Sequence, residues 1–283
     1  PMRETISWKT EGPFSLDHLI QVVERLRDPE AGCPWDIQQS FKSILSSTLE
    51  ECYELIDAIQ KEDFSHVEEE LGDVLFQVVF YAQMGSEESY FDLASVIDGL
   101  VKKLIRRHPH VFGSSEENLN CDPKRDNKHM SVSEVKDTWE KIKVQERTAK
   151  DHRSALADVP LALPSLSRAQ KIQKRASQVG FDWKDIDGPL GKIEEEILEL
   201  RDSLSTGDRD QIKSELGDLL FSCVNLSRHL NLDAEESLRS ATAKFEKRFV
   251  AIENEVGRSD RLVKDLSMAD YNALWEKVKN LNL

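Results

Sequence analysis

Acidic residues recur at the same spacing in the two halves of the chain. The first half carries a Glu-Glu-x-x-Glu motif followed by Glu-x-x-Asp, with its acids at Glu50, Glu51, Glu54, Glu70 and Asp73. The second half repeats both motifs at a constant distance of 145 residues, with its acids at Glu195, Glu196, Glu199, Glu215 and Asp218. Carboxylates gathered in this way can bind a divalent cation or orient a water molecule, so these residues are the first candidates for chemistry.

Basic and aromatic residues follow the acids in matching order. Four such residues of the first half have counterparts in the second, and the pairs are Lys103 with Lys244, Arg107 with Arg248, Trp139 with Trp275 and Lys143 with Lys279. The distance between partners falls to 141 and then to 136, so the first copy has about nine more residues in its loops. The chain therefore contains a duplicated domain.

Two prolines mark the junction between the copies. Pro160 and Pro164 exclude a continuous helix there. We therefore expect an N-terminal extension over residues 1–14, a first domain over 15–150, a linker over 151–166 and a second domain over 167–283.

Apolar residues recur with helical periodicity, and strand patterns are almost absent. The spacing predicts a helix from Leu16 to Leu26 with Ser15 as its N-cap. On the next expected helix, the acids of the first motif fall within a sector of about 100°, largely opposite the apolar stripe. The helix that carries Glu70 and Asp73 is apolar around most of its circumference, which predicts a central, buried helix. The fold class we expect is all-α, with two tandem helical bundles of four or more helices each.

Helical acids are usually solvated, but this pattern favours a metal site. Glu70 and Asp73 open an almost wholly apolar helix, where unpaired carboxylates are costly. Two carboxylates about 4 Å apart repel by about 4 kcal/mol at an effective dielectric constant of 20. A hard divalent cation relieves this repulsion, and all-oxygen ligands favour Mg²⁺ or Mn²⁺. A di-iron carboxylate site is excluded, because no histidine of the sequence is preceded by glutamate three residues earlier.

The composition excludes other classes of function. The net charge of −15 disfavours polymeric nucleic acid as a partner, although a bound cation can still admit small phosphate ligands. No apolar stretch is long enough to span a membrane. The four cysteines lack CxxC spacing, and no signal-peptide pattern opens the sequence, so we expect a cytoplasmic protein that uses no zinc site.

These motifs resemble those of a known family. The acidic pattern is that of the all-α nucleoside triphosphate pyrophosphohydrolases, and the tandem arrangement resembles the MazG family. Further support comes from five short segments, at residues 26–29, 32–36, 106–112, 168–174 and 179–183. The resemblance implies Mg²⁺-dependent hydrolysis of nucleoside triphosphates to monophosphate and pyrophosphate, broad base tolerance and a homodimer.

The resemblance also suggests roles for individual residues. In the second domain we expect the metal ligands to be Glu196, Glu199, Glu215 and Asp218. Glu195 is either a further ligand or the base that orients water. We expect the phosphates to be held by Lys192, Lys244 and Arg248, and the nucleotide to be bordered by Trp275 and Lys279. The counterparts in the first domain are Glu50, Glu51, Glu54, Glu70, Asp73, Lys103, Arg107, Trp139 and Lys143.

The sequence leaves open which domain is the main catalytic unit, which of the functions of this fold applies, and whether two tryptophans contact the base. Ser47 stands where the second domain has Lys192, which favours the second domain as the main catalytic unit. A nucleotide sensor of the same fold with little turnover is one alternative. A narrower dUTP, dCTP or phosphoribosyl-ATP pyrophosphatase is another. Trp35 and Trp183 are as consistent with packing as with base contact.

Overall fold

The computed structural model confirms an all-α fold. It describes residues 11–113, 131–149, 154–258 and 262–280, and it contains no strand within them. Most of the predicted N-terminal extension and the start of the predicted linker lie outside the described residues. The chain divides into two compact units, residues 1–144 and 145–283. No helix in the described ranges is long and apolar enough to cross a bilayer.

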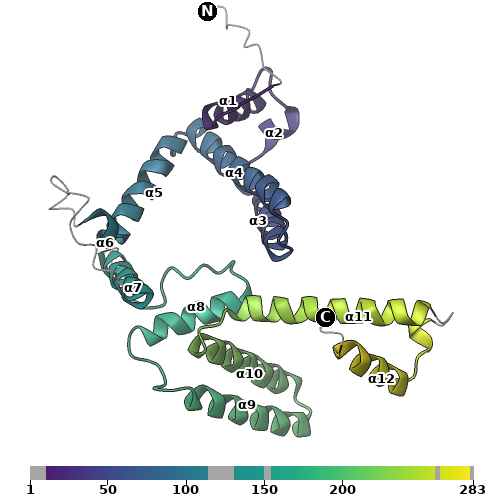
Figure 1. The fold of residues 1–283 in the computed structure, drawn as a ribbon. Coiled ribbons are helices and arrows are strands. Elements are labelled where there is room, and N and C mark those ends of the chain that lie inside the picture. The colour runs from purple at the N-terminus through teal and green to yellow at the C-terminus, as the bar shows by residue number, and fades with distance from the viewer. Residues whose placement is uncertain (1–10, 114–130, 150–153, 259–261, 281–283) are drawn as a thin grey trace, which may run out of the picture. The chain divides into compact units, whose positions relative to one another are not determined.

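Both units are built on a hairpin of two helices that carry the acids (Figure 1). The helices of the first unit are α1 (Leu16–Leu26), α2 (Pro34–Gln38), α3 (Leu45–Gln60), α4 (Phe64–Glu87), α5 (Leu93–Arg107), α6 (Pro109–Phe112) and most of α7 (Val132–Ala149), whose last five residues fall in the second unit. Those of the second are α8 (Ser165–Ser177), α9 (Asp187–Thr206), α10 (Arg209–His229), α11 (Ala234–Gly257), the short 3₁₀ helix η1 (Val263–Asp265) and α12 (Met268–Lys279). Helices α3 and α4 pack together in the first unit, as α9 and α10 do in the second.

The turns of the two hairpins have the same structure, a residue with positive φ followed by an aspartate N-cap. In the first, Glu62 adopts a positive φ of 56°, and the Asp63 carboxylate then caps α4 by accepting from the His66 backbone N–H at 3.2 Å. In the second, Gly207 has a φ of 72°, and Asp208 caps α10. A left-handed residue followed by an aspartate cap reverses the chain within a few residues, at 61–63 in the first hairpin and at 207–208 in the second. This tight turn sets the register in which the acids of the two helices face each other.

The core of the first unit lies on one face of α4. Val79 and Phe80 pack against Val23 of α1 and against Ile44, which directly precedes α3. The prediction of a helix from Leu16 to Leu26 with Ser15 as N-cap is confirmed. In the second unit, α8 packs on α10 and α11, and a separate core joins α11 to α12 through Ile252, Val256 and Val278.

The prediction that α4 is buried all round is wrong for this chain. Leu71, Leu75 and Val78 are exposed, because the neighbouring helices α1, α3 and α5 cover only the other faces of α4. Helix α10 repeats the feature, since Leu216 and Leu220 are exposed at the positions that match Leu71 and Leu75. The two hairpins thus present equivalent apolar surfaces that the helices of their own unit leave exposed.

Arg27 ties the end of α1 to α2 and α4. Its side chain is 8% exposed, and its guanidinium donates to the Glu87 carboxylate and to the backbone oxygens of Asp36 and Gln39. It also lies over the Phe80 ring, 5.2 Å from the centroid. Arg27 therefore satisfies polar groups from two segments at the edge of the core.

Replacing Arg27 by alanine is expected to destabilise the first unit by about 3 kcal/mol, because the Glu87 carboxylate and two carbonyl oxygens lose their donor. Chemical denaturation measures the change. Arg25→Ala on the same helix is the matched control: Arg25 is half-exposed and pairs with Asp28 at 3.6 Å, so its loss should cost under about 1 kcal/mol. Equal losses for the two variants would contradict this role of Arg27.

Candidate metal centre and the adjoining pocket

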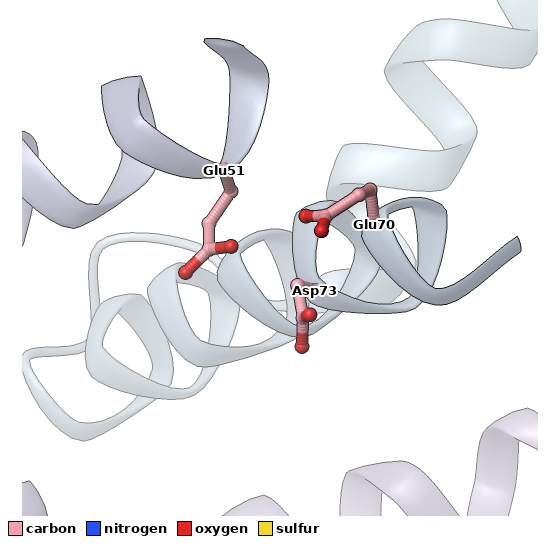
Figure 2. A group of neighbouring side chains, drawn as sticks. All are labelled: Glu51, Glu70 and Asp73. Carbon is pink, nitrogen blue, oxygen red and sulfur yellow. The ribbon is translucent and has the colours of Figure 1, made fainter. Parts of the chain in front are cut away.

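Three carboxylates converge in the first hairpin. Glu51 comes from α3, and Glu70 and Asp73 come from α4, one turn apart (Figure 2). One oxygen of each lies within 4.8 Å of an oxygen of the other two. The tight turn between the helices places Glu51 beside the first turns of α4, so two helices supply one cluster.

The second hairpin repeats the cluster at matching positions. Glu196 of α9 meets Glu215 and Asp218 of α10, again with ligand oxygens within 4.8 Å of one another. Each cluster thus joins one acid of the Glu-Glu-x-x-Glu motif to both acids of the second motif. The other predicted acids, Glu50, Glu54, Glu195 and Glu199, are exposed at the margins of the clusters.

The electrostatics of both clusters fit a cation. At this separation two carboxylates repel by about 3.5 kcal/mol at an effective dielectric constant of 20. Glu70 is 5% exposed and Glu196 is 3% exposed, and in each residue Oε2 is buried without a hydrogen-bond partner. A buried, unpaired carboxylate oxygen is costly, and a metal ion would satisfy it. The residues present therefore fit a hard divalent cation with oxygen ligands.

The pKa values of two carboxyl groups at these clusters are raised. Burial raises the pKa of Glu51, and the charges of Asp73, Glu54 and Glu70 raise it further. The pKa of Glu199 is raised as well, first by slight desolvation of a side chain that stays exposed and then by the Glu196 charge. Glu54 and Glu199 therefore lie within electrostatic reach of their clusters, although neither is among the three converging acids.

The two clusters have different cationic neighbours. In the second unit, the Lys192 ammonium lies 2.8 Å from Glu195 and 2.7 Å from Glu196, and hydrogen bonds to these two carboxylates raise the pKa of Lys192. Ser47 stands at the matching position of the first unit. There, His66 Nε2 lies 2.6 Å from Glu70 Oε1. A lysine ammonium thus lies beside the second cluster, whereas a histidine ring lies beside the first.

A pocket of about 400 Å³ adjoins the second cluster. Glu196, Asp218 and Lys192 form part of its wall, and apolar side chains that include Trp183 and Phe221 form most of the rest. Pockets of this size and character are typical of small-molecule sites. The acids therefore face a space that can hold a ligand larger than a metal ion.

An ion-pair network fixes the segment that carries Trp183. The carboxylate of Asp182 bonds to the guanidinium of Arg228 and lies 3.0 Å from Nε2 of His229 on α10. The hydrogen bonds from Arg228 hold the pKa of Asp182 below its usual range. The network keeps the connection between α8 and α9 against α10, so one wall of the pocket is anchored.

The structure brings only part of the predicted phosphate site together. Arg248 of α11 lies over the Trp275 ring of α12, 5.9 Å from the centroid, while Lys244 is exposed and Lys279 pairs with Glu276. None of the four is among the residues that line the pocket. Their contact with phosphate therefore stays a prediction, and of the basic residues expected in the second domain only Lys192 lies at the acidic cluster.

Their counterparts in the first unit also lie outside its acidic cluster. Lys103 and Arg107 are on α5, a helix without a fully buried residue. Trp139 packs against the His108 ring at 5.0 Å, and its buried Nε1 has no partner. Lys143 pairs with Glu140 at 3.2 Å. Substrate contact by these four residues likewise stays a prediction.

Three polar residues, one at the first cluster and two in the pocket wall, were not predicted from the sequence as site residues. His66 had a signal, because it lies four residues before Glu70 and so shares its helical face. Asn225 also had a sequence signal, because it is polar at the position where the first repeat has the apolar Phe80. Gln173 of α8 lies in the segment 168–174 that supports the family resemblance, but its burial depends on the packing of α8 against α10, which the spacing of residues does not show.

Comparison with known proteins gives concordant matches. Residues 39–112 and 190–250 match the family described as the MazG nucleotide pyrophosphohydrolase domain. These segments include the first hairpin and all of the second except the first three residues of α9. A protein of Escherichia coli K12 named nucleoside triphosphate pyrophosphohydrolase is 46% identical over 267 residues, which cover 93% of this chain and 97% of that protein. A Thermotoga maritima protein named nucleoside triphosphate pyrophosphohydrolase/pyrophosphatase MazG is 44% identical over 269 residues, which cover 95% and 97%.

Divalent cations should stabilise the protein in a pH-dependent manner. A carboxyl with a raised pKa favours the folded state when protonated, and this contribution is lost as the pH rises through the raised value. A cation binds the ionised form, so it should restore stability most at neutral pH. We expect Mg²⁺ or Mn²⁺ to raise the melting temperature by several degrees at about pH 7.5 and by much less at about pH 5.

Thermal denaturation with and without the cation measures this effect. Replacing both Glu70 and Glu215 by glutamine should reduce the shift strongly. Glu69→Gln, which changes an exposed acid of the same helix, should leave the shift intact. A shift that is equal at both pH values, or equal in these two variants, would contradict cation binding at the clusters.

Proposed function

The chain belongs to the MazG nucleotide pyrophosphohydrolase family, and on that premise we propose that it hydrolyses nucleoside triphosphates between the α and β phosphates with Mg²⁺ as cofactor. The observation that carries the proposal is the second acidic cluster, where the unpaired Oε2 of Glu196 lies beside a pocket of ligand size. The printed names of the relatives support the same activity. Mn²⁺ is the alternative cofactor, since it accepts the same oxygen ligands.

The proposed chemistry assigns the carboxylates to two tasks. Glu196, Glu199, Glu215 and Asp218 would hold the cation. A carboxylate-bound divalent cation supplies charge neutralisation and lowers the pKa of a coordinated water. Glu195 is exposed at the edge of the cluster, where it can orient the attacking water or serve as a further ligand. In the first unit the same tasks would fall to Glu50, Glu51, Glu54, Glu70 and Asp73.

Lys192 is the basic group best placed for the substrate. Its ammonium pairs with Glu195 and Glu196 on the wall of the pocket. When a triphosphate enters, the same ammonium can exchange one carboxylate partner for a phosphate oxygen. Lys244 and Arg248 would contribute further phosphate contacts, and Trp275 and Lys279 would border the nucleotide.

We propose a homodimer with broad base tolerance that removes unwanted nucleotides from the cytoplasmic pool. The unburied apolar residues of the hairpins, Leu71 and Leu75 on α4 and Leu216 and Leu220 on α10, support the dimer, because such surface is costly in water. The expected particle has twice the chain mass of 32.4 kDa. A monomer mass by light scattering would contradict the dimer.

Product analysis tests the activity. The purified protein is incubated with Mg²⁺ and a panel of ribo- and deoxyribonucleoside triphosphates, and phosphorus NMR identifies the products. We expect monophosphate and pyrophosphate from several bases, and loss of both products on adding EDTA. Nucleoside diphosphate with orthophosphate would refute the bond that we propose to be cleaved. Turnover of a single base only would favour a narrow-specificity enzyme.

The two units should differ in their share of activity. The second unit has Lys192 and the adjoining pocket, so Glu215→Ala is expected to lower kcat by about 100-fold or more, through loss of a metal ligand. Glu70→Ala, the matching change in the first unit, should lower kcat less than tenfold. Steady-state kinetics on the two variants measures the difference, and equal losses would contradict this ranking.

A further inference from the structure

The pocket beside the second cluster contains an unpaired hydrogen-bond acceptor. Gln173 of α8 lines the pocket and is 7% exposed. Its Nε2 donates to the backbone oxygen of Phe221 at 2.8 Å, which fixes the orientation of the amide, because a carbonyl oxygen can only accept. The other amide atom, Oε1, is buried without a partner. A buried acceptor without a donor is costly, and this one belongs to a residue of the pocket wall.

Asn225 complements this acceptor with a donor. It also lines the pocket, and its Oδ1 accepts from Nε of Arg228 at 2.9 Å. Since arginine can only donate, the amide of Asn225 is oriented with its NH₂ group available to a ligand. These two amides thus offer the pocket one acceptor and one donor. Such a pair matches the edge of a nucleobase, which presents donors and acceptors on a flat apolar ring.

The first unit has packing residues at the equivalent positions. At the constant distance of 145 residues, Phe80 matches Asn225 and Ile44 matches Pro189, another residue of the pocket wall. Phe80 and Ile44 are buried together with Val23 of α1, the helix that packs on α4 as α8 packs on α10. Gln77, which matches Ser222, is buried and bonds to Thr48. The space that forms a pocket in the second unit is core in the first.

We propose that the second unit holds the nucleobase in this pocket, with Gln173 Oε1 accepting a hydrogen bond from the base edge, and that the first unit has no base site. This inference rests on the proposed function for the identity of the ligand. It assigns Gln173 and Asn225 as residues that determine base recognition. Because each common base can present a donor beside an acceptor, the amide pair is compatible with broad tolerance. A base without a donor on its edge should bind less well.

Adenosine monophosphate and purine riboside monophosphate, which lacks the 6-amino group, provide the test. Their affinities are measured by calorimetry with Mg²⁺ present, so no turnover is needed. We expect the wild-type chain to bind one adenosine monophosphate, and to bind it about tenfold more tightly than the analogue, because the analogue leaves the buried acceptor unpaired. In Gln173→Met the two affinities should become equal.

Gln170→Met is the matched control on the same helix. The Gln170 amide joins α8 to the start of α11, through the Leu232 carbonyl and the Ala234 N–H, and it does not line the pocket. This variant should keep the tenfold preference. Inorganic tripolyphosphate, which has no base, should bind to wild type and Gln173→Met equally, which also establishes that the variant is folded.

Equal affinity of the wild-type chain for the two monophosphates would overturn the proposal. So would an unchanged preference in Gln173→Met, or two monophosphate sites per chain. If only the proposed function failed, the triphosphate products would differ from monophosphate and pyrophosphate. The preference for the amino group would then persist and would still depend on Gln173.

Discussion

Mutual repulsion among carboxylates is the constraint on which both sites depend. Each hairpin forces three acids within 4.8 Å of one another, with one buried glutamate oxygen left without a partner. Nothing in the packing of the helices requires acids there. The tight turns at Glu62–Asp63 and Gly207–Asp208 hold the two helices in the register that creates the cluster. A cation bound at either cluster would therefore stabilise the hairpin that carries it.

Duplication preserved the acids while their surroundings diverged. The second cluster has Lys192 beside it and opens onto a pocket with a polar edge. The first has His66 beside Glu70 and a compact core at the positions that match the pocket wall. That core, with Arg27 at its border, contributes to the stability of the first unit. In the second copy the acids thus adjoin a pocket of ligand size, whereas in the first copy core residues occupy the positions that match part of the pocket wall.

The acids, the duplication and the helical fold could be predicted from the sequence, because they depend on local spacing and on a repeated pattern. The burial of α4 was predicted wrongly, since helical periodicity says which face is apolar and not which neighbour covers it. Lys192 was found at the cluster because it lies one turn from Glu196 on the same helix. Gln173 escaped prediction because its place at the pocket depends on the packing of α8 on α10. Lys244, Arg248 and Trp275 lie on α11 and α12, away from the pocket wall, so spacing alone did not reveal their relation to the acids.

Crystals grown with Mn²⁺ and a non-hydrolysable triphosphate analogue would show whether a cation neutralises the acidic cluster of the second unit, because the anomalous signal at the manganese absorption edge locates the metal. We expect a manganese peak bounded by Glu196, Glu215 and Asp218, with the nucleoside in the adjoining pocket. Nucleotide density in the pocket, without a manganese peak among these three carboxylates, would contradict this expectation.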